Sequence, residues 1–181
     1  TAPSTDRPAP ADPPADRSIA ARTVDAVKVY GAGGTEVRAL DGVTVEVPSA
    51  TFTAVMGPSG SGKSTLMHCL AGLDTLTSGH VFVGDQELGA LNDRELTRVR
   101  RERIGFVFQA FNLLPTLSAR ENITLPMDLA RQAPDAEWLA RVIATVGLED
   151  RLHHRPSELS GGQQQRVAVA RALASKPEVV F

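Results

Sequence analysis

A glycine-rich segment, residues 57–65, has the residue types and spacing that bind phosphate groups. Its first eight residues, Gly-Pro-Ser-Gly-Ser-Gly-Lys-Ser, match the pattern G-x-x-x-x-G-K-[ST] at every fixed position. Glycines permit tight turns that direct several backbone N–H groups at phosphate oxygens, and a following helix adds its positive end. Lys63 supplies a positive charge for the β- and γ-phosphates, and the Ser64 hydroxyl can ligate Mg²⁺. The residues of this predicted site are Gly57, Pro58, Ser59, Gly60, Ser61, Gly62, Lys63, Ser64 and Thr65.

The sequence on either side of this segment predicts a strand before it and a helix after it. Residues 52–56 form a short apolar run that ends at a glycine, and helical character begins after Lys63 and stops near Gly72. A chance glycine turn is the alternative, and the strand and helix argue against it. The pattern also occurs in kinases, GTPases, helicases and transporters, so it predicts nucleotide binding without choosing among these classes.

A second segment, residues 159–166, has the features of another anion site. Ser160 offers a hydroxyl, Gly161 and Gly162 expose backbone N–H groups, and a helix starting near Gln163 follows directly. An ordinary Ser-Gly-Gly helix start is the alternative. The run Leu-Ser-Gly-Gly-Gln-Gln-Gln-Arg resembles the signature sequence of ATP-binding cassette (ABC) proteins, and Ser160 follows Lys63 by 97 residues, as in cassettes.

The resemblance to ABC proteins runs from residue 23 to residue 181 and implies roles for further residues. Tyr30 occupies the place of the aromatic residue that stacks on adenine, although a half-buried strand tyrosine is the alternative. Gln109 follows Phe-Val-Phe, as the Q-loop glutamine of the family does; that glutamine contacts Mg²⁺ and the attacking water and relays to the membrane partner. A polar residue at the end of a strand is the alternative for Gln109. Residues 108–115 and 121–123 resemble the ATPases of lipoprotein release and macrolide export.

Two departures from the family pattern are visible. Ala50 and Thr51 stand where cassettes usually have Gly-Glu, and neither side chain is expected to reach ATP. Family members also continue the strand at residues 179–181 into an Asp-Glu pair, which this sequence does not include. In the family the Asp holds Mg²⁺ through water, the Glu acts as general base, and a later histidine senses the γ-phosphate. We therefore expect the full-length parent to hydrolyse ATP, and the 181-residue chain to bind ATP at most.

Charge, cysteine count and the length of apolar runs limit the partners and the compartment expected for this chain. Nineteen basic and 21 acidic residues give a net charge of −2, which argues against a nucleic-acid partner. One cysteine excludes a disulfide framework and fits a reducing compartment. No apolar run approaches the roughly 18 residues of a membrane-spanning helix. With the resemblance, this predicts a protein on the cytoplasmic face of the plasma membrane, attached through a permease subunit.

The predicted fold is α/β: a P-loop NTPase with a parallel sheet core, an antiparallel strand group near residues 23–55 and a helical subdomain at about 115–165. Residues 1–22, rich in proline and alanine, are predicted to be a disordered tail, and residues 23–181 the ATP-binding domain. Capping-box spacing at Asn92 and Glu95, and at Ser118 and Glu121, predicts two helix starts. Residues 138–146 form one apolar helix face that ends at Gly147.

The function implied by the resemblance is ATP-driven transport, and export for the narrower subfamily. One chain holds one copy of each phosphate-binding segment, so a second cassette, identical or different, is expected as a partner. Ser160 and Gly162 of one cassette would cap the γ-phosphate held by residues 57–64 of the other, in a head-to-tail pair. The alternatives are a soluble ABC ATPase of translation or DNA repair, a P-loop kinase, and an inactive fragment of a cassette.

Overall fold

The computed structural model describes residues 18–181, and most of the predicted tail lies outside this range. The strands are β1 Ile19–Tyr30, β2 Val37–Pro48, β3 Ser78–Val83, β4 Gln86–Glu87, β5 Ile104–Gly105 and β6 Val179–Val180. The α-helices are α1 Lys63–Leu70, α2 Asp93–Arg103, α3 Ala119–Ala130, α4 Ala136–Val146 and α5 Gly161–Ala174, and three 3₁₀ turns are Gly33–Thr35, Glu149–Arg151 and Pro156–Glu158. Because β1 begins at Ile19, the prediction that residues 19–22 belong to a disordered tail is wrong; they pair with both neighbouring strands.

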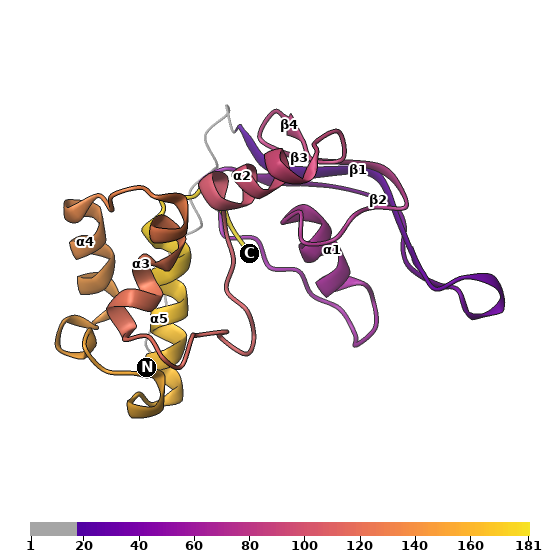
Figure 1. Cartoon of the computed structure of the whole chain (residues 1–181). Coiled ribbons are helices and arrows are strands. Elements are labelled where there is room, and N and C mark those ends of the chain that lie inside the picture. Colours follow the sequence, from indigo (N-terminus) through magenta and orange to yellow (C-terminus); the bar gives the residue numbers. More distant parts are fainter. Residues whose placement is uncertain (1–17) are drawn as a thin grey trace, which may run out of the picture.

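Four strands form an antiparallel sheet in the order β2-β1-β3-β4, with β1 and β3 as its inner strands. Alternate residues of β1 and β3 are buried, and they pack with apolar residues of α1 and α2. Figure 1 shows α1 beneath this sheet and α2 near its left end. We call the sheet, α1, α2 and the β5–β6 pair the sheet unit. Its core consists of Ala21, Leu70, Ala71, Val81, Val83, Leu88, Val99 and Ile104.

The parallel part of the structure is short. Strands β5 and β6 pair in parallel, and the ladder continues as the Val107 N–H donates to the Phe181 carbonyl at 2.8 Å. The strand predicted at residues 52–56 does not form: Phe52 is 98 % exposed and Met56 is 87 % exposed. Within residues 18–181 no strand pairs with this segment, so its backbone belongs to no ladder.

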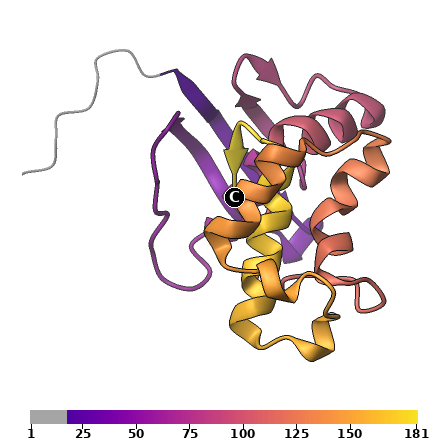
Figure 2. The ribbon, with the colours of Figure 1, turned by 90° about the vertical axis from the view of Figure 1, so that its left-hand side faces the viewer.

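Helices α3, α4 and α5 pack around a second apolar core, and we call these three helices the helical unit. The helical unit lies to one side of the sheet unit in Figure 1 and in front of it in Figure 2. Both predicted capping boxes are present, at Asn92 with Glu95 and at Ser118 with Glu121. Gly147 ends α4 in the left-handed conformation. The core of the helical unit continues to Ala174, beyond the predicted limit near residue 165, because α5 contributes one of its walls.

Candidate nucleotide-binding site

The loop before α1 is held by a close contact with the sheet. Gly62 precedes α1 with a φ of +85°, and a Cβ atom built on it would lie 2.3 Å from the Ala39 carbonyl oxygen of β2. Both the backbone conformation and this approach require glycine. The start of α1 is therefore fixed against β2.

Lys63 folds back over the loop that precedes it. Its ammonium group donates to the Pro58 carbonyl at 2.6 Å and to the Ser61 hydroxyl at 3.3 Å. This geometry places a positive charge over residues 57–62, of which residues 57–61 are exposed. Ser64 follows on the exposed face of the first helical turn.

The N-terminal end of α1 has unused hydrogen-bond donors. Gly62 provides no side-chain cap, whereas side chains of Asn92, Ser118, Asp135 and Ser160 cap the other four α-helices of the described chain. The first N–H groups of α1, those of residues 63–65, donate to no acceptor within residues 18–181. Free N–H groups, a helix N-terminus and an ammonium group in one exposed loop fit a phosphate chain.

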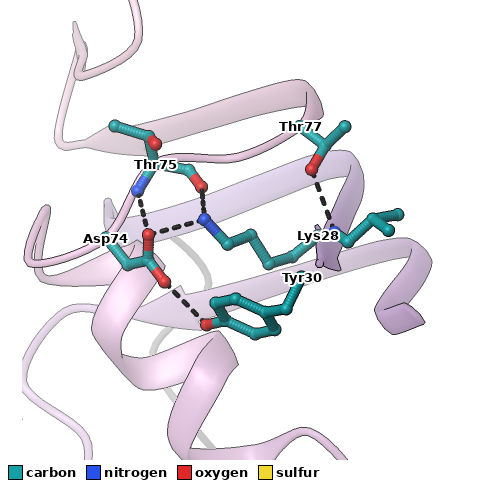
Figure 3. A network of polar contacts seen from close by, with 6 residues as sticks. Lys28, Tyr30, Asp74, Thr75 and Thr77 are labelled. Carbon is teal, nitrogen blue, oxygen red and sulfur yellow. Dashed lines mark hydrogen bonds and ion pairs between the residues drawn. The ribbon is translucent and has the colours of Figure 1, made fainter. Parts of the chain in front are cut away.

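Tyr30 ends β1, and its hydroxyl donates to the Asp74 carboxylate at 2.6 Å (Figure 3). The same carboxylate accepts from the Lys28 ammonium at 2.6 Å and from the Thr75 N–H at 2.7 Å. The hydrogen bond to Asp74 is the main reason that the pKa of Tyr30 is raised; partial burial adds to this, and the Thr65 hydroxyl opposes it. Tyr30 is thereby placed near α1, the helix that begins with Lys63.

Opposing effects act on the two charged groups of this network. Burial acts to raise the pKa of Asp74, but hydrogen bonds from Lys28, Tyr30 and the Thr75 N–H outweigh it, and the pKa lies below its usual value. The Asp74 hydrogen bond raises the pKa of Lys28 against the effect of its burial. Both groups are therefore charged at neutral pH.

Gln109 lies exposed in a turn directly after the segment that extends β5. The Phe106 ring packs against Phe108, with centroids 4.4 Å apart, and against His68 of α1, with centroids 5.8 Å apart. These contacts bring the residues before Gln109 next to α1. The structure thus gathers the loop, Tyr30 and the Gln109 turn around one helix.

The signature residues lie elsewhere, at the start of α5. The Ser160 hydroxyl accepts from the Gln163 N–H at 3.3 Å, and the Gln163 side chain accepts from the Ser160 N–H at 2.8 Å. Gly161 and Gly162 are exposed, with open space where a Cβ would stand. Figure 1 shows α5 beginning at the lower end of the helical unit, away from α1. Within one chain, the two phosphate-binding segments are not brought together.

The sequence analysis assigned no individual role to two residues that shape the chain after Gln109. Arg171 of α5 donates to the Phe111 carbonyl at 2.6 Å and to the Asn112 carbonyl at 2.7 Å, and burial lowers its pKa. Both acceptor residues have positive φ, near +60° and +46°. Asn122 is fully buried and accepts from the Leu114 N–H at 2.8 Å. A polar residue inside the apolar pattern of α3 was the available signal for Asn122, and nothing local pointed to Arg171.

Residues 18–181 contain no helix that is both long enough and apolar enough to span a membrane.

Comparison with known proteins places the chain in a family. The model of the ABC transporter family matches residues 40–181. An uncharacterized ABC transporter ATP-binding protein of Thermotoga maritima is 52 % identical over 161 residues, which cover 87 % of this chain and 68 % of that protein. The lipoprotein-releasing system ATP-binding protein LolD of Idiomarina loihiensis is 45 % identical, over 85 % of this chain and 68 % of that protein.

A longer relative and a solved structure agree with this placement. The macrolide export ATP-binding/permease protein MacB of Hyphomonas neptunium is 48 % identical over 87 % of this chain, but the chain spans only 25 % of that protein's length. The ATP-binding cassette MJ0796, solved as a dimer bound to ADP and Pi, is 41 % identical with a TM-score of 0.80, over 88 % of this chain and 72 % of that one. The predicted α/β P-loop NTPase fold is confirmed, and the chain belongs to the ABC transporter family as the ATP-binding domain of an ABC ATPase.

Proposed function

We propose that this domain binds ATP-Mg²⁺ through residues 57–65 and drives export through a membrane permease. The exposed loop that ends in Lys63, with unused N–H groups at the start of α1, is the observation that carries this proposal. The resemblance to MacB and LolD supports an export-type transporter and makes a soluble ATPase of translation or repair a weaker alternative. Such a domain would act at the cytoplasmic face of the membrane.

Each residue of the site has a distinct task in this proposal. The loop N–H groups and Lys63 bind the phosphates, and Tyr30 offers a ring face to adenine. Ser64 and Gln109 would hold Mg²⁺, which when bound neutralises charge on the transferred phosphate. Gln109 is exposed in its turn, so it is accessible both to nucleotide and to a membrane partner.

The signature residues are proposed to act on a second cassette. Gly161, Gly162 and the Ser160 hydroxyl are exposed at a helix N-terminus that lies away from the chain's own loop. Because the Ser160 oxygen already caps α5, its O–H hydrogen remains available to a phosphate oxygen. A head-to-tail pair would bring these donors to the γ-phosphate on the partner, and the dimeric form of cassette MJ0796 supports such pairing.

Replacing Lys63 tests the phosphate site. We expect Lys63→Ala to weaken binding of a fluorescent ATP analogue about ten- to hundredfold, because one charge-assisted contact is lost. Fluorescence titration of purified protein measures the change. Lys176→Ala is the matched control, since Lys176 is exposed and pairs with Asp135 in the helical unit. Equal affinities in the wild type and Lys63→Ala would reject the proposed site.

A further inference from the structure

The tyrosine ring at the end of β1 is held at its far end by one carboxylate. Asp74 accepts from the Tyr30 hydroxyl through Oδ2 at 2.6 Å and from Lys28 through Oδ1 at 2.6 Å (Figure 3). Lys28 and Tyr30 are two residues apart on β1, so their side chains leave the same face of the sheet. The two oxygens of one carboxylate therefore fix two side chains on the same face of β1.

We propose that Asp74 is a positioning residue for the nucleobase: it orients the Tyr30 ring relative to the phosphate loop and thereby sets the affinity for adenine nucleotides. This inference rests on the proposed function, in which the Tyr30 ring faces adenine. It adds a residue that lies 44 positions from Tyr30 in the sequence.

Asp74 is suited to this task because it is anchored to the helix that begins with Lys63. Its backbone N–H and that of Leu73 both donate to the His68 carbonyl in the last turn of α1, at 3.2 Å and 2.8 Å. One rigid helix therefore separates the phosphate-binding lysine from the group that holds the ring. Any shift of α1 moves both ends of the nucleotide site together.

Lys28 makes the carboxylate position definite. The Lys28 side chain is 11 % exposed, and its ammonium also donates to the Thr75 carbonyl at 2.6 Å. An unpaired buried ammonium is energetically costly, so the Lys28 charge holds the Asp74 carboxylate in this position. The Val29 N–H donates to the Thr77 hydroxyl at 2.9 Å and thereby fixes the strand between Lys28 and Tyr30 (Figure 3).

The two faces of the ring differ. The Lys28 ammonium lies 4.8 Å from the ring centroid, so one face is covered by that side chain. Tyr30 is nevertheless 40 % exposed, which leaves ring surface open to solvent. A ring tethered through its hydroxyl presents that open surface in one orientation, so a base that stacks on it does not have to immobilise it first.

The test compares a ligand that has a base with one that has none. Affinities for a fluorescent ATP analogue and for inorganic tripolyphosphate, as competitor, are measured for the wild type, Tyr30→Phe, Asp74→Asn, the double variant and Tyr30→Ala. Tyr30→Phe keeps the ring and the Lys28–Asp74 pair and removes only the tether. Asp41→Asn is the matched control, because Asp41 is an exposed residue of β2 that pairs with Arg38 and holds no aromatic ring.

We expect Tyr30→Phe and Asp74→Asn each to weaken ATP binding about two- to tenfold, the cost of ordering a freed side chain. Tyr30→Ala should weaken it more, by about five- to a hundredfold, because stacking itself is lost. Tripolyphosphate affinity should stay within about twofold in all variants. The double variant should bind ATP as tightly as whichever single variant has the lower affinity, because both changes remove the same Tyr30–Asp74 hydrogen bond.

Specific outcomes would overturn the inference. Wild-type ATP affinity in Tyr30→Phe, together with weak binding in Tyr30→Ala, would mean that the ring needs no tether. Additive losses in the double variant would mean that Asp74 acts by another route. If Asp74→Asn does not fold, which circular dichroism reports, Tyr30→Phe decides the question alone. Failure of the proposed function gives a different result: tripolyphosphate would not compete with nucleotide, or Tyr30→Ala would bind ATP normally.

Discussion

Cys69 is the single cysteine of the chain, and its thiol is fully buried where α1 packs against the sheet. Burial raises its pKa to about 11; the negative charge of Asp74 adds to this, and Lys28 opposes it. A raised thiol pKa favours the neutral form, so this residue contributes stability below its ordinary pKa of 9.0, and that contribution is lost as the pH passes about 11. Burial and a neutral sulfur both suppress thiol chemistry.

We therefore expect native protein at pH 8 to react with a disulfide reagent at least about a hundredfold more slowly than urea-unfolded protein, because the thiolate and access to it both require unfolding. Release of the coloured thiolate from the reagent measures both rates, and the single cysteine makes the signal stoichiometric. Nucleotide added to the native sample should slow the reaction further if it stabilises the fold. Comparable native and unfolded rates would contradict the packing of Cys69.

Asn122 joins helix α3 to the segment that follows Gln109. Its amide oxygen accepts from the Leu114 N–H, and its amide nitrogen donates to the carbonyls of Leu114, Leu117 and Ser118 at 3.0–3.2 Å. No exposed surface remains on this residue, so water cannot replace these bonds without opening the segment. One side chain thus satisfies the backbone of a whole turn.

Replacing Asn122 by leucine should lower the free energy of unfolding by about 2–3 kcal/mol, because the hydrogen bonds made by a fully buried amide are lost while the side-chain volume stays similar. Urea unfolding followed by circular dichroism measures the loss. Gln132→Leu, an exposed amide just after α3, provides the comparison and should change the stability by less than about 0.5 kcal/mol. A loss in Asn122→Leu no larger than that of the control would be inconsistent with the buried network.

Helix boundaries could be predicted from the sequence where neighbouring residues decide them. The capping boxes at Asn92 and Ser118 and the stop at Gly147 depend on residues three or four positions apart, and all three predictions are confirmed. The apolar run at residues 52–56 depends on a distant pairing partner, and the predicted strand is absent from the described chain. Residues joined over long separations were missed for the same reason: 44 positions lie between Tyr30 and Asp74, and 60 between Phe111 and Arg171.

The molecule is built around separate apolar cores. The core of the helical unit draws on residues from 113 to 174, whereas the sheet unit uses residues from 21 to 106 together with 179 and 181. The chain crosses between the units in the segment after Gln109 and again after α5 (Figure 1). Few crossings and separate cores favour partly independent opening of the two units.

Truncating a residue of the helical core should therefore loosen that unit first. We expect Leu139→Ala to lower the stability of the helical unit by about 2–4 kcal/mol, while amide exchange in β1 and β3 changes little. Trp138, the single tryptophan, donates to the Leu173 carbonyl at 2.8 Å and reports on this unit by fluorescence. Val81→Ala, in the sheet core, should give the reverse pattern. Equal losses of protection in both units would show one cooperative body.

Helix α5 has the geometry of a lever arm. Ser160 caps one end, and Arg171 grips two carbonyls beyond Gln109 from a point about 16 Å along the axis, at roughly 1.5 Å per residue. A tilt of about 10° about either end would carry the other end about 3 Å, a distance comparable to the whole length of a hydrogen bond. The grip of Arg171 cannot stretch that far, so it must either drag the loop with the helix or let go. A force applied at the Ser160 end would then leave the segment after Gln109 in one of two discrete states, either moved together with α5 or released from Arg171.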